Sequence, residues 1–398
     1  MTSVSRQLRS DVPVGTFLSG GMDTGAISAL AQMHLGNMHS FTCGFSTAHM
    51  EGYEKFFDER SEARELAQHL GTCHHDIEVT PKDMPSLLPL VAWHLEEPCV
   101  GISYQNHAIA KTVGDHVVVV MSGAGGDELF GGYDRYQQVQ RLERVRSALP
   151  LSARRVLGAA LKRLSVENWD RLGNGPLRSV LPSGLQHRTG HRMHKVGALL
   201  AVDDGSDVYA SLMSIENQVD RLVLGSDSQS PGHPGISSAL LNEMSPPERS
   251  MLIDTLTYLP DDLLTKVDRA SMAVSLEVRV PFLDPDLFNF AWGLSSADRA
   301  RRGESKWLLR EVLRRSLPDN LIDRPKMGFA VPVGQWLRGP LRSWAEELLC
   351  PALVKEQGIL DPLVVERRWK AHRDGHSDLT FQVWSLLMFQ AWLAENQR

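Results

Sequence analysis

The hydrophobic and polar positions of the first 140 or so residues alternate between short apolar runs and longer segments with helical spacing. Four runs are typical of strands: 12–18, 39–45, 73–79 and 116–121. The last run, HVVVVM, is apolar without alternation, which is typical of a parallel strand buried on both faces. Helices are expected between the strands, near 24–35, 59–70, 83–96 and 103–113. This β-α-β order predicts an α/β fold with a parallel sheet flanked by helices.

The pattern changes beyond about residue 145, where a basic segment with helical period begins and strand signals fade. The stretch 226–235 is polar and contains two prolines, which predicts a surface loop. The sequence therefore predicts three regions. They are an α/β region at 1–145, a variable helical excursion at 146–235 and a mostly helical region at 236–398.

Composition narrows the class of protein. The 398 residues are 42% hydrophobic and 23% charged with a formal net charge of -6, so nothing points to nucleic acid or an anionic membrane as a partner. The four cysteines are scattered without a C-x-x-C pair, which favours reduced thiols over a secreted scaffold or a structural zinc site. No apolar stretch reaches the roughly 18–20 residues of a membrane span, and the N-terminus lacks an apolar signal core. A cytoplasmic location is expected.

A glycine-rich loop, LSGGMDTG at 18–25, follows the first predicted strand. Gly20 and Gly21 allow a sharp turn whose N–H groups can hold an anion at a helix start. Asp23 would repel a phosphate there, so a cation is expected between them. The loop does not match the G-x-x-x-x-G-K-[ST] pattern of kinase-type phosphate loops, and no G-x-G-x-x-G indicates a dinucleotide enzyme.

A second glycine-rich loop, MSGAGGDELFGGYDRY at 121–136, follows the buried strand and places Asp127 at its exit. Because ligands bind at the carboxyl ends of parallel strands, the two loops are expected to meet. Mg²⁺ can then bridge Asp23 and Asp127 to the pyrophosphate part of ATP. The alternative is that each loop is only a turn with an acidic residue near a helix start. The hydroxyl groups of Ser19 and Thr24 favour the phosphate site.

These residues carry a resemblance to a known family. SGGMDTG resembles the SGGxDS loop of the ATP pyrophosphatase superfamily. MSGAGGDELFGGYDRY, LEVRVPFLD at 276–284 and RPKMGF at 324–329 resemble the synthetase domain of asparagine synthetases. The match runs from Asp11 to about Arg144 and from about Leu259 to the end. It implies that a carboxylate is adenylated, pyrophosphate is released, and a nitrogen nucleophile displaces AMP.

The resemblance also implies roles for single residues. Lys326 would stabilise charge on the reacting phosphate, and Asp23 and Asp127 would act with it by holding Mg²⁺. The implied nucleotide contacts are Leu18, Ser19, Gly20, Gly21, Asp23, Thr24, Cys43, Gly44, Ser122 and Gly123. Asp268–Arg269 and Glu277–Arg279, in a predicted helix-and-turn stretch, are either near the acceptor site or part of an ion-paired scaffold.

Two departures from the family matter. Asparagine synthetases begin with a cysteine-headed glutaminase domain, whereas Thr2 follows Met1 here, so ammonia is expected from solution or from a separate glutaminase or other ammonia-supplying subunit. Ala124 stands where the family has a glutamate or aspartate and a β-lactam-closing relative has a tyrosine. A methyl group cannot accept a proton from an attacking amine.

These departures leave three activities open. The first is formation of asparagine from aspartate and ammonia. The second is formation of a lactam or another amide in specialised metabolism. The third is a catalytically weakened nucleotide-binding subunit that acts with a partner. A homodimer is compatible with all three. The histidine-rich stretch 187–195 is expected to be a solvated surface, because its spacing fits no metal site.

Overall fold

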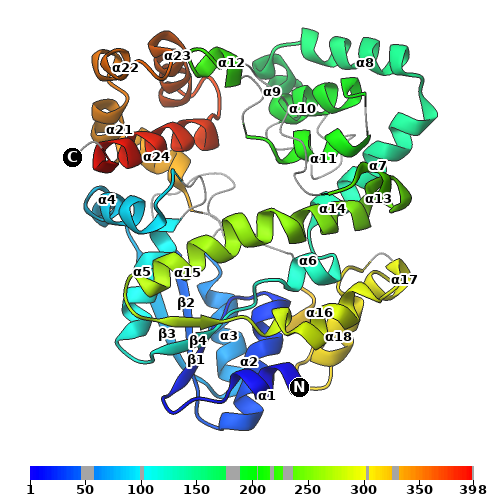
Figure 1. The fold of residues 1–398 in the computed structure, drawn as a ribbon, viewed down its shortest axis with the longest axis vertical. Coiled ribbons are helices and arrows are strands. Elements are labelled where there is room, and N and C mark those ends of the chain that lie inside the picture. The colour runs from blue at the N-terminus through cyan, green and yellow to red at the C-terminus, as the bar shows by residue number, and fades with distance from the viewer. Residues whose placement is uncertain are drawn as a thin grey trace. The chain divides into compact units, whose positions relative to one another are not determined.

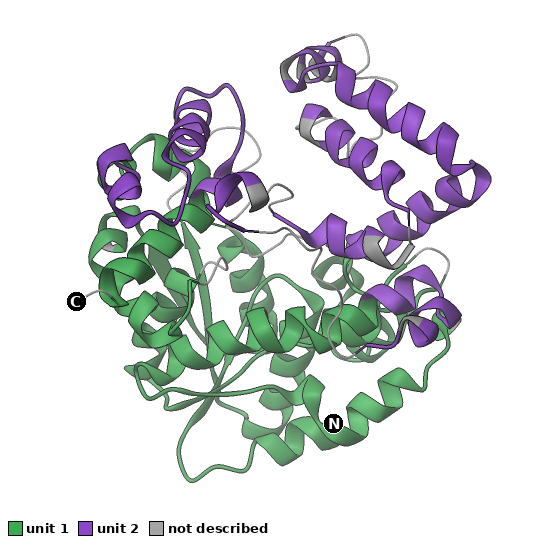
Figure 2. Ribbon diagram, turned by 45° about the horizontal axis from the view of Figure 1, so that its top comes forward, with its two compact units in different colours: residues 1–133, 251–348, 384–398 green, residues 134–250, 349–383 purple. Residues whose placement is uncertain are grey.

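The computed structural model describes residues 1–45, 58–98, 103–175, 189–203, 205–215, 219–226, 236–301, 304–324 and 331–396. The chain forms two compact units (Figure 2). The first contains residues 1–133, 251–348 and 384–398, and the second contains residues 134–250 and 349–383. The three-region division made from the sequence stays a prediction.

The first unit is built on a five-stranded parallel sheet (Figure 1). Its strands, in the order β3-β2-β1-β4-β5, are β1 (Val14–Phe17), β2 (His39–Phe45), β3 (Cys73–Val79), β4 (Val119–Met121) and β5 (Glu277–Arg279). The four strands predicted in the first 140 residues, and the α/β fold class, are confirmed. β4 begins three residues later than predicted because the N–H groups of His116 and Val117 donate to the carbonyl of Val113 in a turn.

β5 corrects one expectation, since Glu277–Arg279 is a strand rather than part of a helix-and-turn stretch. The N–H of Glu277 donates to Val118 O (2.9 Å), and the N–H of Ser122 donates to Arg279 O (2.8 Å). Three residues are too short to show a hydrophobic period. Pairing with β4 creates the strand.

Helices cover both faces of this sheet. α2 (Met22–Leu35) and α3 (Arg60–Leu70) follow β1 and β2 and pack together, whereas α4 (Met84–Leu95) and α5 (Ser103–Gly114) pack against α15 (Thr265–Met272). The chain moves outward from β1 to β3 and then returns to β4, so right-handed crossovers place the two sets of helices on opposite faces. The point where strand order reverses lies between β1 and β4. Ligands of open parallel sheets bind at such a point.

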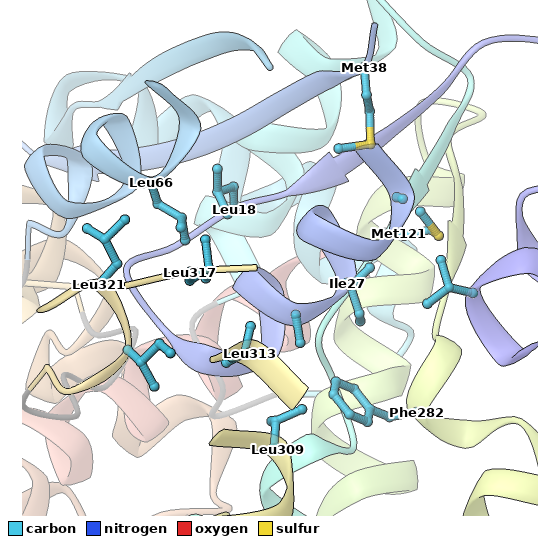
Figure 3. Packing of buried hydrophobic residues seen from close by; sticks show 14 of the residues in the cluster. Leu18, Ile27, Met38, Leu66, Met121, Phe282, Leu309, Leu313, Leu317 and Leu321 are labelled. Atoms are coloured by element: carbon cyan, nitrogen blue, oxygen red, sulfur yellow. The ribbon is translucent and has the colours of Figure 1, made fainter. Parts of the chain in front are cut away.

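A hydrophobic cluster beneath α2 holds these elements in place (Figure 3). Leu18 and Ile27, at the end of β1 and in α2, are buried with Phe282, Leu309 and Leu313 from the C-terminal half of the chain. Burying a side chain of this size contributes about 1.5–3 kcal/mol. The same cluster therefore fixes both the first loop and the helix α18 (Trp307–Leu313).

Shorter elements complete the first unit: α1 (Thr2–Gln7), α6 (Gly126–Phe130), a π-helical turn at Tyr258–Leu264, α16 (Pro285–Trp292), α17 (Ser296–Arg299), α19 (Asp319–Ile322), α20 (Val333–Arg338) and α21 (Arg342–Leu348). The regular elements that the structure describes in the second unit are α7 (Asp134–Ala148), α8 (Leu151–Arg163), α9 (Val166–Asn174), α10 (Thr189–Ala201), α11 (Gly205–Met213), α12 (Val219–Leu222), α13 (Ser238–Glu243), α22 (Pro351–Gln357) and α23 (Pro362–Arg373). α14 (Pro246–Leu256) and α24 (Thr380–Asn396) belong partly to each unit. Among the residues described, none of the helices combines the length and apolarity that crossing a membrane requires.

Candidate active site

The first glycine-rich loop joins β1 to α2 and is held by its own hydroxyl groups. The N–H of Ser19 donates to Thr24 Oγ1 (3.1 Å), and the N–H of Gly21 donates to Ser19 Oγ (3.1 Å). α2 starts at Met22, directly after the loop, and runs for 14 residues. The first-turn amides and the positive end of the helix dipole therefore lie at the loop, where they favour an anion.

The second loop joins β4 to α6 and is fixed from its other side. The N–H of Ala124 donates to Ser122 Oγ (3.3 Å), while the N–H of Ser122 is bonded to β5. Gly125 has a φ of 87°, a left-handed conformation that glycine adopts without a steric penalty. The turn at Gly125 starts α6 and places Asp127 in its first turn.

The two loops touch each other through two glycines of the second loop. A Cβ on Gly123 would lie 2.9 Å from the backbone nitrogen of Thr24, and a Cβ on Gly126 would overlap the Asp23 carboxylate. No larger residue fits there without moving one loop. The expectation that the ends of neighbouring strands bring Asp23 and Asp127 together is confirmed.

Lys306 lies between the two aspartates. Its Nζ forms ion pairs with Asp23 Oδ2 and with Asp127 Oδ1, the second at 2.6 Å. The side chain of Lys306 is only 3% exposed, and the two carboxylates are 18% and 17% exposed. Lys306 lies 283 positions from Asp23 in the sequence, so folding brings a cation of this chain itself to the first loop.

The backbone at Lys306 is unfavourable by itself. Lys306 is the N-cap residue of α18 and has a φ of 54°. A cation at a helix N-terminus opposes the helix dipole, and a left-handed conformation costs a non-glycine residue about 1–3 kcal/mol. The two carboxylates offset these penalties. Sequence reasoning missed Lys306, although a lysine directly before a helical run (ESKWLLR) was a signal that something anionic lies nearby.

The charges at this site determine the protonation of Lys306. Burial alone would lower its pKa, but the electrostatic attraction and hydrogen bonds of Asp23 and Asp127 raise it above the ordinary value. Lys306 therefore stays an ammonium ion. Two carboxylates and one ammonium leave the group with a net negative charge, which suits a divalent cation better than a bare phosphate.

Glu128, next to Asp127 on α6, is fully buried and was not singled out from the sequence. Its Oε1 accepts a hydrogen bond from the hydroxyl of Tyr133 (2.8 Å). Burial raises the pKa of Glu128 to about 7, although the hydrogen bond from Tyr133 lowers it. A carboxyl group that titrates near neutral pH therefore lies one residue from a candidate metal ligand.

The other predicted nucleotide contacts surround the same sheet edge. Leu18 has its side chain in the core cluster and its N–H bonded to Phe41 O (2.7 Å), which leaves its carbonyl as the group that can meet a ligand. Cys43 and Gly44 lie near the carboxyl end of β2. Burial raises the pKa of the Cys43 thiol, so this thiol is not a nucleophile. The roles of these residues, like those of Ser19 to Thr24, Ser122 and Gly123, stay predictions.

Lys326 lies outside the described residues. Arg324, just before it, is held against α3: its Nη1 donates to Glu62 O (2.9 Å), and its Nη2 pairs with Glu65. A Cβ on Gly20 would lie 3.9 Å from the same Nη1. Arg324, the last described residue before Lys326, is thus anchored beside the first loop.

Asp268–Arg269 and Glu277–Arg279, expected either near the acceptor site or in an ion-paired scaffold, contain arginines that donate to backbone carbonyls. Arg279 donates to Gln7 O (2.6 Å) and Arg9 O (2.8 Å) and pairs with Glu277 (2.6 Å). Arg269 donates to Leu95 O and lies 3.8 Å from Glu96. These contacts favour the scaffold over the acceptor site.

Known proteins resemble this chain over nearly its whole length. The sequence profile of the family described as asparagine synthase matches residues 1–394. A Mycobacterium bovis protein provisionally named asparagine synthetase (glutamine-hydrolyzing) is 34% identical over 397 residues, which are 98% of this chain and 56% of that protein. Asparagine synthetase (glutamine-hydrolyzing) 1 of Bacillus subtilis is 27% identical over 402 residues, covering 99% and 58%. The amidase chry2 of Gibberella zeae is 24% identical over 400 residues, covering 94% and 56%. The chain spans a little over half the length of these relatives.

Proposed function

The chain belongs to the asparagine synthase family, and we propose that it joins a carboxylate to ammonia or an amine with the consumption of ATP. In the first half-reaction a carboxylate oxygen attacks the α-phosphorus of ATP, giving an acyl-adenylate and pyrophosphate. In the second, the nitrogen attacks the acyl carbon, AMP leaves, and one proton is released. The products are an amide, AMP and pyrophosphate.

One observation supports this proposal above the others: two loops at the strand-order reversal bring Asp23 and Asp127 onto a single buried ammonium ion. A structural ion pair would need only one carboxylate. Two carboxylates beside helix N-terminal amides are instead arranged for a polyphosphate with its cation.

The donor set fits Mg²⁺, which prefers oxygen ligands and is held by one or two carboxylates together with substrate phosphates. Asp23 and Asp127 would hold it, and bound Mg²⁺ would neutralise charge on the pyrophosphate group. The close approach that Gly123 and Gly126 permit keeps both carboxylates on one cation.

The remaining roles belong to this chain's own groups. The amides of Gly20 and of residues 22–24 bind the phosphate chain, and Ser19 and Thr24 keep the loop closed. Lys306, held as an ammonium ion, orients both carboxylates and supplies positive charge as the pyrophosphate leaves. We assign Lys326 to the reacting α-phosphate, where charge changes most as the adenylate forms.

The residue at position 124, Ala124, bears on which carboxylic acid the protein joins to nitrogen. Aspartate with ammonia is the first substrate pair to test, because its product, asparagine, is the one in the names of two relatives. Ala124 leaves the second loop without the carboxylate that the family pattern has at this position. The second candidate function is therefore an amide ligase that acts on another acid. A substrate group or water then takes the proton from the attacking nitrogen.

The proposal extends to the setting of the reaction. The nitrogen reaches the site as free ammonia or an amine, with a separate ammonia-supplying subunit as the source in a cell, and the reaction takes place in the cytoplasm. Glutamine is the control donor in every assay.

The test measures AMP and pyrophosphate released from Mg²⁺-ATP with a panel of carboxylates, each with ammonium, with glutamine or with no nitrogen donor. The expected result is AMP formation that depends on one carboxylate, with the amide appearing only when a nitrogen donor is present. Asp23→Asn should abolish it. Asp115→Asn is the matched control, because Asp115 is an exposed carboxylate at the far end of α5.

Two results would contradict the proposal. Formation of ADP and phosphate in place of AMP would show a different activation chemistry. ATP binding without AMP formation for every acid tested would indicate the third activity, a nucleotide-binding subunit without ligase function.

A further inference from the structure

A cluster of soft metal ligands lies at the amino ends of β2 and β3. His39 is the first residue of β2, and Cys73 and His75 are the first and third residues of β3. One ligand atom of each residue lies within 4.8 Å of those of the other two. The proposed active site uses none of these residues.

The sheet register explains why the three side chains meet. His39 pairs with Cys73, and Phe41 pairs with His75, across the parallel β2–β3 ladder. Alternate residues of a strand share a face, so His39, Cys73 and His75 all project to the same side. His74 projects to the other side, where it contacts Ser40 (2.9 Å). Of the consecutive residues Cys73, His74 and His75, the first and the third therefore belong to the cluster.

The distances already approach those of a tetrahedral site. Bonds of 2.0–2.1 Å to nitrogen and 2.3 Å to sulfur imply ligand separations of about 3.4 Å between nitrogens and about 3.6 Å between nitrogen and sulfur. Cys73 Sγ lies 3.7 Å from His75 Nε2. His39 Nδ1 lies 2.8 Å from the same Nε2, in a hydrogen bond that must lengthen by about 0.6 Å.

Aromatic rings cover one side of the cluster. The ring of His116 lies with its centroid 4.1 Å from that of His75 and covers it, and the ring of Phe41 stacks on His75 at 4.9 Å. His39 and His75 are half-buried, whereas Cys73 is exposed and forms no disulfide. The site therefore has a packed side and a side that faces solvent.

The cluster is separate from the ATP site. Gly15 of β1 lies level with His39, and the first loop begins at Leu18, three residues further along the chain. At about 3.3 Å per residue this is a separation of about 10 Å along the sheet. The cluster lies at the amino ends of strands, and the candidate active site at the carboxyl ends.

We propose that His39, Cys73 and His75 form a three-ligand Zn²⁺ site that joins the edge strand β3 to β2. Thiolate and imidazole are the ligands that select Zn²⁺ over Mg²⁺. The Cys73 S–H bond breaks as the S–Zn bond forms, and the proton leaves to solvent. The proton shared between His39 and His75 moves to the outer nitrogen of the ring that carries it, so that both inner nitrogens present lone pairs.

The primary test uses the full chain after removal of metals, titrated with Co²⁺ as a spectroscopic probe for Zn²⁺ in buffer that contains Mg²⁺. The expected result is one Co²⁺ per chain, with a thiolate-to-cobalt charge-transfer band in the near ultraviolet and displacement by Zn²⁺. Binding should release one proton per ion. Absence of the band, or of saturable binding, would overturn the proposal without any variant being made.

Variants then locate the site. Cys73→Ser should abolish the charge-transfer band, and His75→Ala should weaken Zn²⁺ binding by more than the ~10–100-fold that loss of an outer-shell partner costs. Cys350→Ser, a second free cysteine, is the matched control and should keep the band. Asp23→Asn should keep it too. A band that survives Cys73→Ser, or that disappears in Cys350→Ser or Asp23→Asn, would place the metal elsewhere and refute the proposal.

Discussion

Replacing Lys306 with methionine tests the central feature of the candidate active site. Methionine keeps the length of the side chain and removes the charge, so the carboxylates of Asp23 and Asp127 lose their shared counter-ion. Removing one partner of a buried ion pair costs about 3–5 kcal/mol. Because both carboxylates retain 17–18% exposure and some hydration, we expect a loss near the lower end, about 3 kcal/mol.

The same substitution should change how Mg²⁺ acts without ATP. In the unaltered protein a metal ion must compete with the Lys306 ammonium for the two carboxylates. In Lys306→Met the carboxylates are uncompensated, so Mg²⁺ should stabilise the variant more than the unaltered protein at equal concentration. AMP formation should nevertheless fall, because positive charge at the departing pyrophosphate is lost.

Urea unfolding of both proteins, at several Mg²⁺ concentrations and followed by tryptophan fluorescence, measures these effects. Lys266→Met is the matched control, since Lys266 is a partly buried lysine whose ion pair with Asp262 (2.7 Å) lies within one helical stretch. That variant should lose less than about 1 kcal/mol and show the ordinary response to Mg²⁺.

The reasoning is refuted by either of two results. If Lys306→Met is as stable as Lys266→Met, the carboxylates do not depend on the ammonium ion. If Mg²⁺ stabilises both variants equally, then the metal and Lys306 do not share Asp23 and Asp127 as partners.

Three further changes probe the surroundings of this site. Gly126→Ala places a Cβ on the Asp23 carboxylate and should lower kcat for AMP formation about a hundredfold. The control Gly114→Ala should keep the rate, because a Cβ there meets only Val274 O at 3.9 Å. Equal rates for the two variants would refute the close contact of the loops. Glu128→Gln should flatten the pH dependence of stability. Burial raises the pKa of Glu128 from 4.5 to about 7, so its stabilisation is present below pH 4.5 and is lost as pH rises through 7, by at most about 3 kcal/mol. If denaturant titrations across this range show the same dependence of unfolding free energy on pH in the variant and the unaltered protein, the assignment is contradicted. Ala124→Glu should raise the ratio of amide to AMP measured by product analysis, and an unchanged ratio would show that no carboxylate is needed there.

The elements that carry this chemistry could be predicted from the sequence where neighbouring residues determine the secondary structure. β2 and β3 begin and end at the predicted residues, and the strand-loop-helix order located both glycine-rich loops before any geometry was known. β4 was predicted too long because valine favours strands wherever it occurs, whereas the amides of His116 and Val117 are committed to a turn after α5. Local propensity could not distinguish the two environments.

What the sequence could not show are the partners that only folding brings together. Lys306 meets Asp23 across 283 residues, and β5 exists only because β4 offers it a ladder. His39 and Cys73 are 34 positions apart, and the absence of a C-x-x-C pair favours reduced thiols over a zinc site when only the sequence is considered. Ligands supplied by alternate residues of adjacent strands leave the pattern C-x-H, which is too short to be recognised without the register.

The two proposed cation sites can be tested in one protein because they differ in chemistry. The carboxylates at the carboxyl ends of β1 and β4 favour a hard ion, whereas the thiolate and imidazoles at the amino ends of β2 and β3 favour a soft one. A chelator removes both ions, so activity and stability should fall together. Mg²⁺ alone should restore AMP formation while β3 remains loosely held, and Zn²⁺ alone should restore resistance to unfolding without activity. Recovery of both properties by a single ion would mean that the chain has one functional cation site, and the cluster of His39, Cys73 and His75 would then have no structural role.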